Sequence, residues 1–146
     1  MRINDFIGEY YAVWFGMNGV YDMWAKKHGT TYNNLFVLYI IAESEEGCTS
    51  HEICEKLLLP KQTVGSILDG FERSGYIKKD TSEKDKRSKL LSLTEAGRVY
   101  ADTLLGKLYL FEQQAFKDVK ESDMKKFLAA NKKLFAVMKK QLQEDF

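Results

Sequence analysis

The sequence predicts a mainly α-helical protein with one small β-hairpin, folded as a single domain of 146 residues. Apolar residues recur at intervals of three and four along most of the chain, which is the spacing of helices with one buried face. The single proline, Pro60, and the lack of any long Ser- or Gly-rich tract predict no disordered linker. Strand-like runs occur only within residues 76–93.

The composition is that of an ordinary globular protein, with 45% apolar and 29% charged residues. A net charge of +1 neither requires nor excludes a polyanionic partner. The longest early uncharged run, residues 10–21, is too short to cross a bilayer, and no cleavage site of a secretory signal follows it. We therefore expect a cytoplasmic protein with no membrane segment.

A first helix is expected over residues 3–27, ending before Gly29, because glycine commonly follows the last turn of a helix. Its apolar stripe consists of Ile3, Phe6, Ile7, Tyr10, Val13, Trp14, Met17, Tyr21 and Trp24. Tyr11, Phe15 and Val20 lie off this stripe, so the helix is apolar around most of its circumference. One core would not bury so much apolar surface, and a second chain is therefore expected.

Two further helices are predicted by their caps. Thr31 can cap a second helix whose nearly continuous apolar run, residues 35–41, predicts that it is buried. An acidic stretch that contains Gly47 ends this helix. Thr49 and Glu52 then have the spacing of a capping box, which opens a short third helix through Leu58.

A fourth helix is expected to begin at Pro60, because the first turn of a helix does not use the N–H that proline lacks. It runs to about Ser74, and Gly75 closes it. Its apolar residues have the spacing of one buried face: Val64, Ile67, Leu68 and Phe71.

The periodicity then changes to that of strands. Residues 76–79 and 89–93 are predicted to form a hairpin, separated by a tract, residues 80–88, that is too charged to bury. Thr94 caps a long fifth helix, and a last helix carries the apolar residues between positions 124 and 138.

This order of elements is that of a helix-turn-helix followed by a wing. In such a motif the second helix, which here is the fourth helix of the chain, can enter a major groove of DNA. At about 100° per residue, the face of the fourth helix opposite its buried side carries Gln62, Ser66, Asp69 and Arg73, flanked by Lys61, Thr63 and Gly65. Gln62 can bind adenine through two hydrogen bonds, and Lys61 can reach guanine or phosphate. Thr63 and Ser66 can bind several bases. An ordinary solvated helix face has the same polarity, so both interpretations stay open here.

The predicted hairpin carries an excess of positive charge. Residues 76–89 contain six basic and three acidic residues, whereas residues 1–48 contain three basic and six acidic ones. The six basic residues are Lys78, Lys79, Lys84, Lys86, Arg87 and Lys89. Such an excess suits phosphate neutralisation, and Arg87 on a narrow tip can enter a minor groove. Asp85 is expected to position Arg87 or a nearby lysine. A surface hairpin kept in solution by mixed charge is the alternative.

Residues 85–97, DKRSKLLSLTEAG, resemble the wing signature of the MarR family of bacterial transcriptional regulators, which is D-x-R, five residues and then L-T-x-x-G. Thr63-Val64 and Gly75-Tyr76-Ile77 are similar to the family's recognition helix and its exit. The resemblance covers essentially the whole chain.

The resemblance implies a homodimeric repressor that binds a pseudo-palindromic operator in double-stranded DNA and is released by a small ligand. It assigns residues 31–95 to a winged helix-turn-helix lobe, and residues 1–30 and 96–146 to a helical dimerisation region. The residues that it places on DNA are Lys61, Gln62, Thr63 and Ser66 in the major groove and Arg87 in the minor groove. The charge excess adds Lys84 and Lys86 as wing residues that bind DNA, with Asp85 as the residue that positions the wing.

The resemblance also implies a pocket for a small aromatic or anionic effector between the helical region and the lobes. Four aromatic residues can line it: Trp14, Phe15, Tyr39 and Phe111. Aromatic residues at helical spacing are more often part of a core, which is the alternative interpretation.

Two other functions stay open, namely a thiol-based sensor that acts through Cys48 and a winged-helix protein-interaction module that does not bind DNA. Without an export signal, both cysteines are expected to be reduced thiols. Cys48 is expected in a loop where it can be exposed, and Cys54 is expected to be buried.

Catalysis and metal binding are not expected. His28 and His51 are too few and too scattered for a metal site, and His51 is expected to face solvent. The chain has neither a Gly-rich phosphate loop nor a nucleophile elbow, so we expect no enzyme activity and no cofactor.

Overall fold

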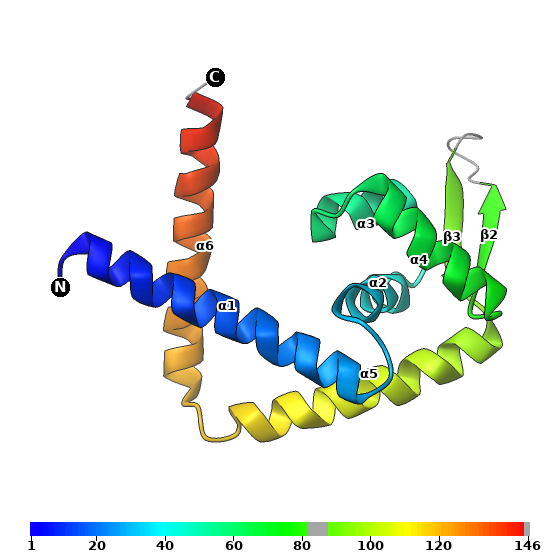
Figure 1. Ribbon diagram of the computed structural model, residues 1–146, viewed down its shortest axis with the longest axis horizontal. Helices are drawn as coiled ribbons and strands as arrows, with labels where there is room; N and C mark the ends of the chain where they lie inside the picture. Colours follow the sequence, from blue (N-terminus) through cyan, green and yellow to red (C-terminus); the bar gives the residue numbers. More distant parts are fainter. Residues whose placement is uncertain (82–87, 145–146) are drawn as a thin grey trace. The chain divides into compact units, whose positions relative to one another are not determined.

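The computed structural model describes residues 1–81 and 88–144, and its described part is mainly helical with a small antiparallel sheet, as the sequence predicts (Figure 1). The elements, in chain order, are α1 (Ile3–Lys27), α2 (Tyr32–Glu43), β1 (Cys48–Thr49), α3 (Ser50–Leu57), α4 (Lys61–Arg73), β2 (Ile77–Thr81), β3 (Lys89–Leu93), α5 (Glu95–Phe116) and α6 (Glu121–Glu144). The chain divides into two compact units, Met1–Gly106 and Lys107–Phe146, and the division falls within α5.

The helices α2 and α3 begin where their capping residues predict. The side chain of Thr31 accepts a hydrogen bond from the backbone N–H of Asn34 at 3.1 Å, which caps α2. The capping box of α3 is complete, because Thr49 Oγ1 accepts from Glu52 N–H at 3.2 Å and Glu52 Oε2 accepts from Thr49 N–H at 3.0 Å.

The predicted end of α3 and the predicted start of α4 are each wrong by a single position, since α3 ends at Leu57. Pro60 precedes α4 as its cap, with an extended backbone (φ −60°, ψ 146°), instead of forming the first residue of the helix. The fixed φ of proline suits both places, so sequence alone does not separate them. The C-terminal boundary is confirmed, since Ser74 caps α4 and Gly75 follows with φ +76°.

The core of the first unit is built around α2, which contacts α1, α3, α4 and β3. Five residues of its predicted apolar run are buried: Leu35, Val37, Leu38, Ile40 and Ile41. From α4, Val64, Leu68 and Phe71 are buried as predicted, whereas Ile67 is half-buried. The polar side of α4 therefore faces away from α2.

The hairpin is confirmed, and a third strand that the sequence does not predict joins it. In the described part of the chain the strand order is β1-β3-β2, and both pairings are antiparallel. Ile77 pairs with Leu93 and Thr81 with Lys89, so the first strand lies slightly later than predicted. The two residues of β1 are too few to show any periodicity in the sequence. They form a strand only because they pair with β3.

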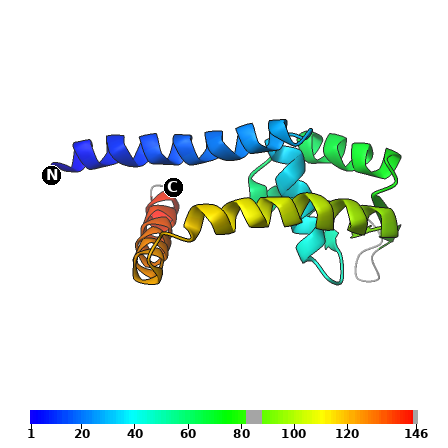
Figure 2. The ribbon, with the colours of Figure 1, turned by 90° about the horizontal axis from the view of Figure 1, so that it is seen from below.

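α1 is one unbroken helix whose N-terminal half extends away from α2, α3 and α4 (Figure 2). Of its residues 3–27, only Trp24 and Ala25 are buried. These two lie in the last turns, near where Tyr21 packs edge-on against Phe36 of α2 with 5.5 Å between ring centroids. Most of the apolar surface that the sequence places on this helix is thus uncovered within the first unit.

The second unit contains the end of α5 and all of α6. None of residues 121–144 is buried. Surface ion pairs run along α6, such as Lys125 Nζ to Glu121 Oε1 at 2.6 Å. Within the described residues, no helix combines the length and the apolar character needed to span a bilayer.

Candidate nucleic-acid interface

The face of α4 predicted to read DNA is on the surface. Lys61, Gln62 and Ser66 are exposed and Thr63 is half-buried, all within the first two turns of the helix. The buried Val64 and Leu68 anchor the opposite side. The helix therefore presents amide, hydroxyl and ammonium groups outward from a rigid base. The roles of these four residues stay predictions.

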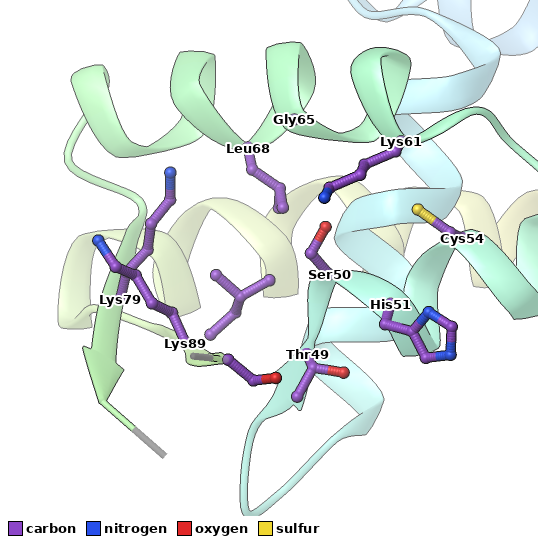
Figure 3. A pocket seen from close by; sticks show the side chains of 11 residues that line it. Thr49, Ser50, His51, Cys54, Lys61, Gly65, Leu68, Lys79 and Lys89 are labelled. Carbon is purple, nitrogen blue, oxygen red and sulfur yellow. The ribbon is translucent and has the colours of Figure 1, made fainter. Parts of the chain in front are cut away.

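A hollow of about 460 Å³ lies on one side of α4, between this helix, the start of α3 and the sheet (Figure 3). Three cationic side chains line it, from Lys61, Lys79 and Lys89. Figure 3 shows the amine of Lys61 and the hydroxyl of Ser50 directed into this hollow. Positive charge thus borders the first turn of α4 on its wing side.

A second hollow, of about 500 Å³, lies on the other side of the same helix face. It brings Gln62, Thr63 and Ser66 of α4 together with Asn33 and Asn34 at the start of α2. The sequence does not predict these two amides as site residues, because the apolar run of α2 indicates only a buried helix. The position of these asparagines in the sequence could have indicated them, because they lie in the first turn of α2, directly after its cap Thr31 and its first residue Tyr32.

The wing strand β2 is tied to α4 by an ion pair. Lys79 Nζ lies 2.9 Å from Asp69 Oδ1 and 3.8 Å from Glu72 Oε1. The hydrogen bond from Lys79 and its positive charge lower the pKa of Asp69, with a smaller contribution from Arg73. Lys79 belongs to the predicted basic excess, but its charge is directed at the acidic residues of α4.

The other wing residues divide into two groups. Lys78 is exposed, with Nζ 3.9 Å from Asp80 Oδ2, and Lys89 is exposed beside the first hollow. The predicted tip residues Lys84, Asp85, Lys86 and Arg87 lie outside the described residues, so their roles stay predictions.

The predicted effector residues are surface aromatics. Trp14 and Phe15 are exposed on α1, with ring centroids 5.8 Å apart. Tyr39 of α2 is exposed, and Phe111 belongs to the second unit, where it is also exposed. The two hollows beside α4 are lined by other residues. An effector role for these four residues stays a prediction.

The predicted environments of both cysteines are wrong. Cys48 is only 2% exposed, because Gly47 (φ +87°) turns the chain and places Cys48 opposite Leu91 in the sheet. Burial raises the pKa of its thiol, and a hydrogen bond with Ser44 opposes this only in part. Cys54 is half-buried and lines the first hollow. A thiol sensor needs an accessible thiolate, so the environment of Cys48 argues against that alternative.

His51 faces solvent, as predicted, and its Nε2 lies 3.1 Å from Glu55 Oε1. Across residues 1–81 and 88–144, His, Cys, Asp and Glu side chains do not gather in any group of three that could hold a metal ion.

Known proteins with similar sequences and folds are transcriptional regulators. The MarR family profile matches residues 28–88. The HTH-type transcriptional regulator PapX of Escherichia coli is 34% identical over 112 residues, which are 75% of this chain and 67% of PapX. NMB1585, a MarR family regulator from Neisseria meningitidis, has a TM-score of 0.82 and 32% identity, with both chains covered completely.

Two more distant structures share the fold. The MepR–DNA complex of S. aureus has a TM-score of 0.74 and 19% identity, over 88% of this chain and 97% of that one. CouR of Rhodococcus jostii RHA1, bound to p-coumaroyl-CoA, has a TM-score of 0.75 and 19% identity, over 92% of this chain and 94% of that one.

Proposed function

The chain belongs to the MarR family of transcriptional regulators, and from this premise we propose that it is a homodimeric repressor that binds a pseudo-palindromic operator in double-stranded DNA. One observation carries the proposal: the outward polar face of α4 lies between a cation-lined hollow and an amide-lined hollow. This arrangement matches a DNA duplex, whose base edges are flanked by phosphates on both sides.

In this proposal α4 enters the major groove with its first two turns. Gln62 and Ser66 face base edges, because both are exposed on the outermost line of the helix. Lys61 neutralises a phosphate or binds guanine. Asn33 and Asn34 at the start of α2 bind the phosphate backbone on the far side of the groove, where amides commonly hold DNA in register.

The wing reads the neighbouring minor groove in the same proposal. Arg87 enters the groove, Lys84 and Lys86 neutralise flanking phosphates, and Asp85 orients Arg87. The antiparallel pairing of β2 with β3 supports this role, since the paired residues Thr81 and Lys89 belong to a hairpin that contacts α4 through β2.

A second copy of the chain is proposed to cover α1. Phe6 is 48% exposed, and Ile3, Val13 and Met17 are also exposed on a helix that extends from the lobe. Monomeric proteins rarely leave such a continuous apolar surface in water. Residues 1–30 and 96–146 then form the dimerisation region, and two lobes of residues 31–95 bind half-sites about 34 Å apart.

Release by a small aromatic or anionic ligand completes the proposal. CouR, which shares the fold, was solved with p-coumaroyl-CoA bound. Exposed aromatic rings such as those of Trp14, Phe15 and Tyr39 suit a planar ligand by stacking. Phe111 is the fourth candidate.

A titration of labelled duplex DNA at two salt concentrations tests the proposal. We expect binding that weakens as salt increases, because lysines that neutralise phosphates release counterions. A matched single-stranded oligonucleotide serves as the control. Negligible affinity for duplex DNA, or binding with no salt dependence, would contradict the proposal and favour a protein-interaction module.

A further inference from the structure

We infer that Lys79 is a positioning residue for DNA binding, which holds strand β2 against α4 and masks the carboxylates of Asp69 and Glu72 from DNA phosphates. This inference rests on the proposed function and adds to it a residue that acts through its neighbours.

The geometry joins two elements that the proposal places in adjacent grooves. Lys79 lies at the centre of β2, paired in register with Leu91 of β3. Its side chain is 18% exposed and is directed at α4 (Figure 3). Its Nζ lies 2.9 Å from Asp69 Oδ1 and 3.8 Å from Glu72 Oε1. The two acidic residues are three positions apart, so they share one edge of the helix. One ammonium group therefore bridges both carboxylates to the wing.

The two carboxylates are in an unfavourable place for a DNA-binding helix. Asp69 follows Ser66 by three residues, so it continues the exposed line that the proposal places in the major groove. Carboxylates that face DNA phosphates across an interface raise the free energy of binding, because like charges repel. Lys79 offsets part of this negative charge at contact distance, and the lowered pKa of Asp69 agrees with a close cation.

Stability alone does not account for the pair. Asp69 and Glu72 have side chains that are 59% and 50% exposed, and ion pairs in such surroundings contribute little to folding. The lysine is the sequestered member, which makes its amine a poor candidate for direct phosphate contact. Any effect of Lys79 on DNA affinity must then come from its interaction with Asp69 and Glu72.

A cycle of variants separates this indirect role from direct contact. Lys79→Met is measured in the wild-type background and in an Asp69→Asn, Glu72→Gln background, using the duplex that the wild type binds most tightly in a random pool. We expect Lys79→Met to weaken binding about tenfold in the wild-type background and hardly at all in the neutralised background. Lys79→Arg should retain most of the affinity.

Lys78→Met is the matched control, because Lys78 is the neighbouring residue on the same strand and is directed away from the pair. Its effect should be equal in both backgrounds. An equal loss for Lys79→Met in both backgrounds would show a direct phosphate contact and overturn the inference. So would a fall in thermal stability with unchanged affinity of the folded protein. If the wild type itself binds no duplex, the proposed function fails and this role fails with it.

Discussion

Gly97, in the first turn of α5, lies against the backbone carbonyl of Tyr76, so closely that a Cβ at this position would come within 1.8 Å of the oxygen. Thr94 holds the two segments together, since its N–H donates to Tyr76 O at 3.0 Å and its hydroxyl donates to Gly75 O. The hydroxyl oxygen also accepts from Gly97 N–H at 3.0 Å. The L-T-x-x-G sequence therefore fastens the exit of α4 to the start of α5.

Gly97→Ala is expected to destabilise the protein by about 1–3 kcal/mol, because the added methyl group meets rigid backbone and forces α5 to move. Thermal unfolding measures the loss. Gly106→Ala in the same helix is the control, since among the described residues only its own helix backbone and chain neighbours would lie within 4 Å of an added methyl group. That variant should be slightly more stable than the wild type. Equal behaviour of the two variants would contradict the close contact at Gly97.

Thr49→Ala removes the capping box that starts α3 and is expected to lower the free energy of unfolding by about 1 kcal/mol. Chemical denaturation checks this value. Thr49→Ser keeps the hydroxyl and should retain most of the stability. If serine is as harmful as alanine, then the methyl group of Thr49 matters and the cap does not.

Gln62→Ala and Arg87→Ala are expected to affect DNA binding in different ways. Loss of Gln62 should cost about 1–3 kcal/mol, mainly at one base pair in each half-site, because an amide reads a base edge. Loss of Arg87 should weaken binding to most sequences. Binding competitions against duplexes with single substitutions distinguish the two patterns. If Gln62→Ala weakens binding to all duplexes equally, α4 does not read base edges through Gln62.

Phe6→Glu is expected to weaken self-association by on the order of 100-fold, because dimer formation would then bury an unpaired charge against the apolar face of α1. Sedimentation velocity measures the change. Lys27→Glu lies at the end of the same helix and changes charge outside the apolar stripe, so it should leave the dimer intact. A wild type that is monomeric at micromolar concentration would contradict the proposed assembly.

Burial of Cys48 makes stability depend on pH in the alkaline range. The pKa of this thiol is raised above its ordinary 9.0 in the folded state, so above pH 9.0 the unfolded chain loses this proton first. The folded protein should therefore lose stability as pH rises above 9.0, with a slope of at most about 1.4 kcal/mol per pH unit. Cys48→Ala removes this contribution. As pH rises above 9.0, the wild type should therefore lose the stability that it has over the variant, and the difference between their unfolding free energies should shrink. A difference that stays constant between about pH 7 and about pH 10 would contradict the burial.

The helices could be predicted from sequence because their ends carry local chemical signals. Thr31, Thr49 and Gly75 act through hydrogen bonds and backbone conformations within a few residues, so their neighbours in the chain suffice. The polar face of α4 followed from the position of its buried residues for the same reason. The wing hairpin was found by its change of periodicity.

Three features that the sequence does not predict depend on partners distant in the chain. Cys48 is a buried strand residue only because β3, more than forty positions later, pairs with it. The ion pair of Lys79 with Asp69 joins residues ten positions apart, and the hollow that Asn33 and Gln62 both line joins residues nearly thirty positions apart. The order of charges along the chain contains no sign of these pairings, so the sequence places Lys79 among the cations that suit phosphate neutralisation.

Selection of bound duplexes from a random DNA pool is the decisive measurement for operator binding by a dimer, because one consensus reports symmetry, spacing and base preference together. We expect two inverted half-sites whose centres lie about one helical turn apart, with a base preference that changes when Gln62 is replaced. Recovery of no enriched sequence, or of a single half-site without symmetry, would contradict a dimer that reads DNA through α4.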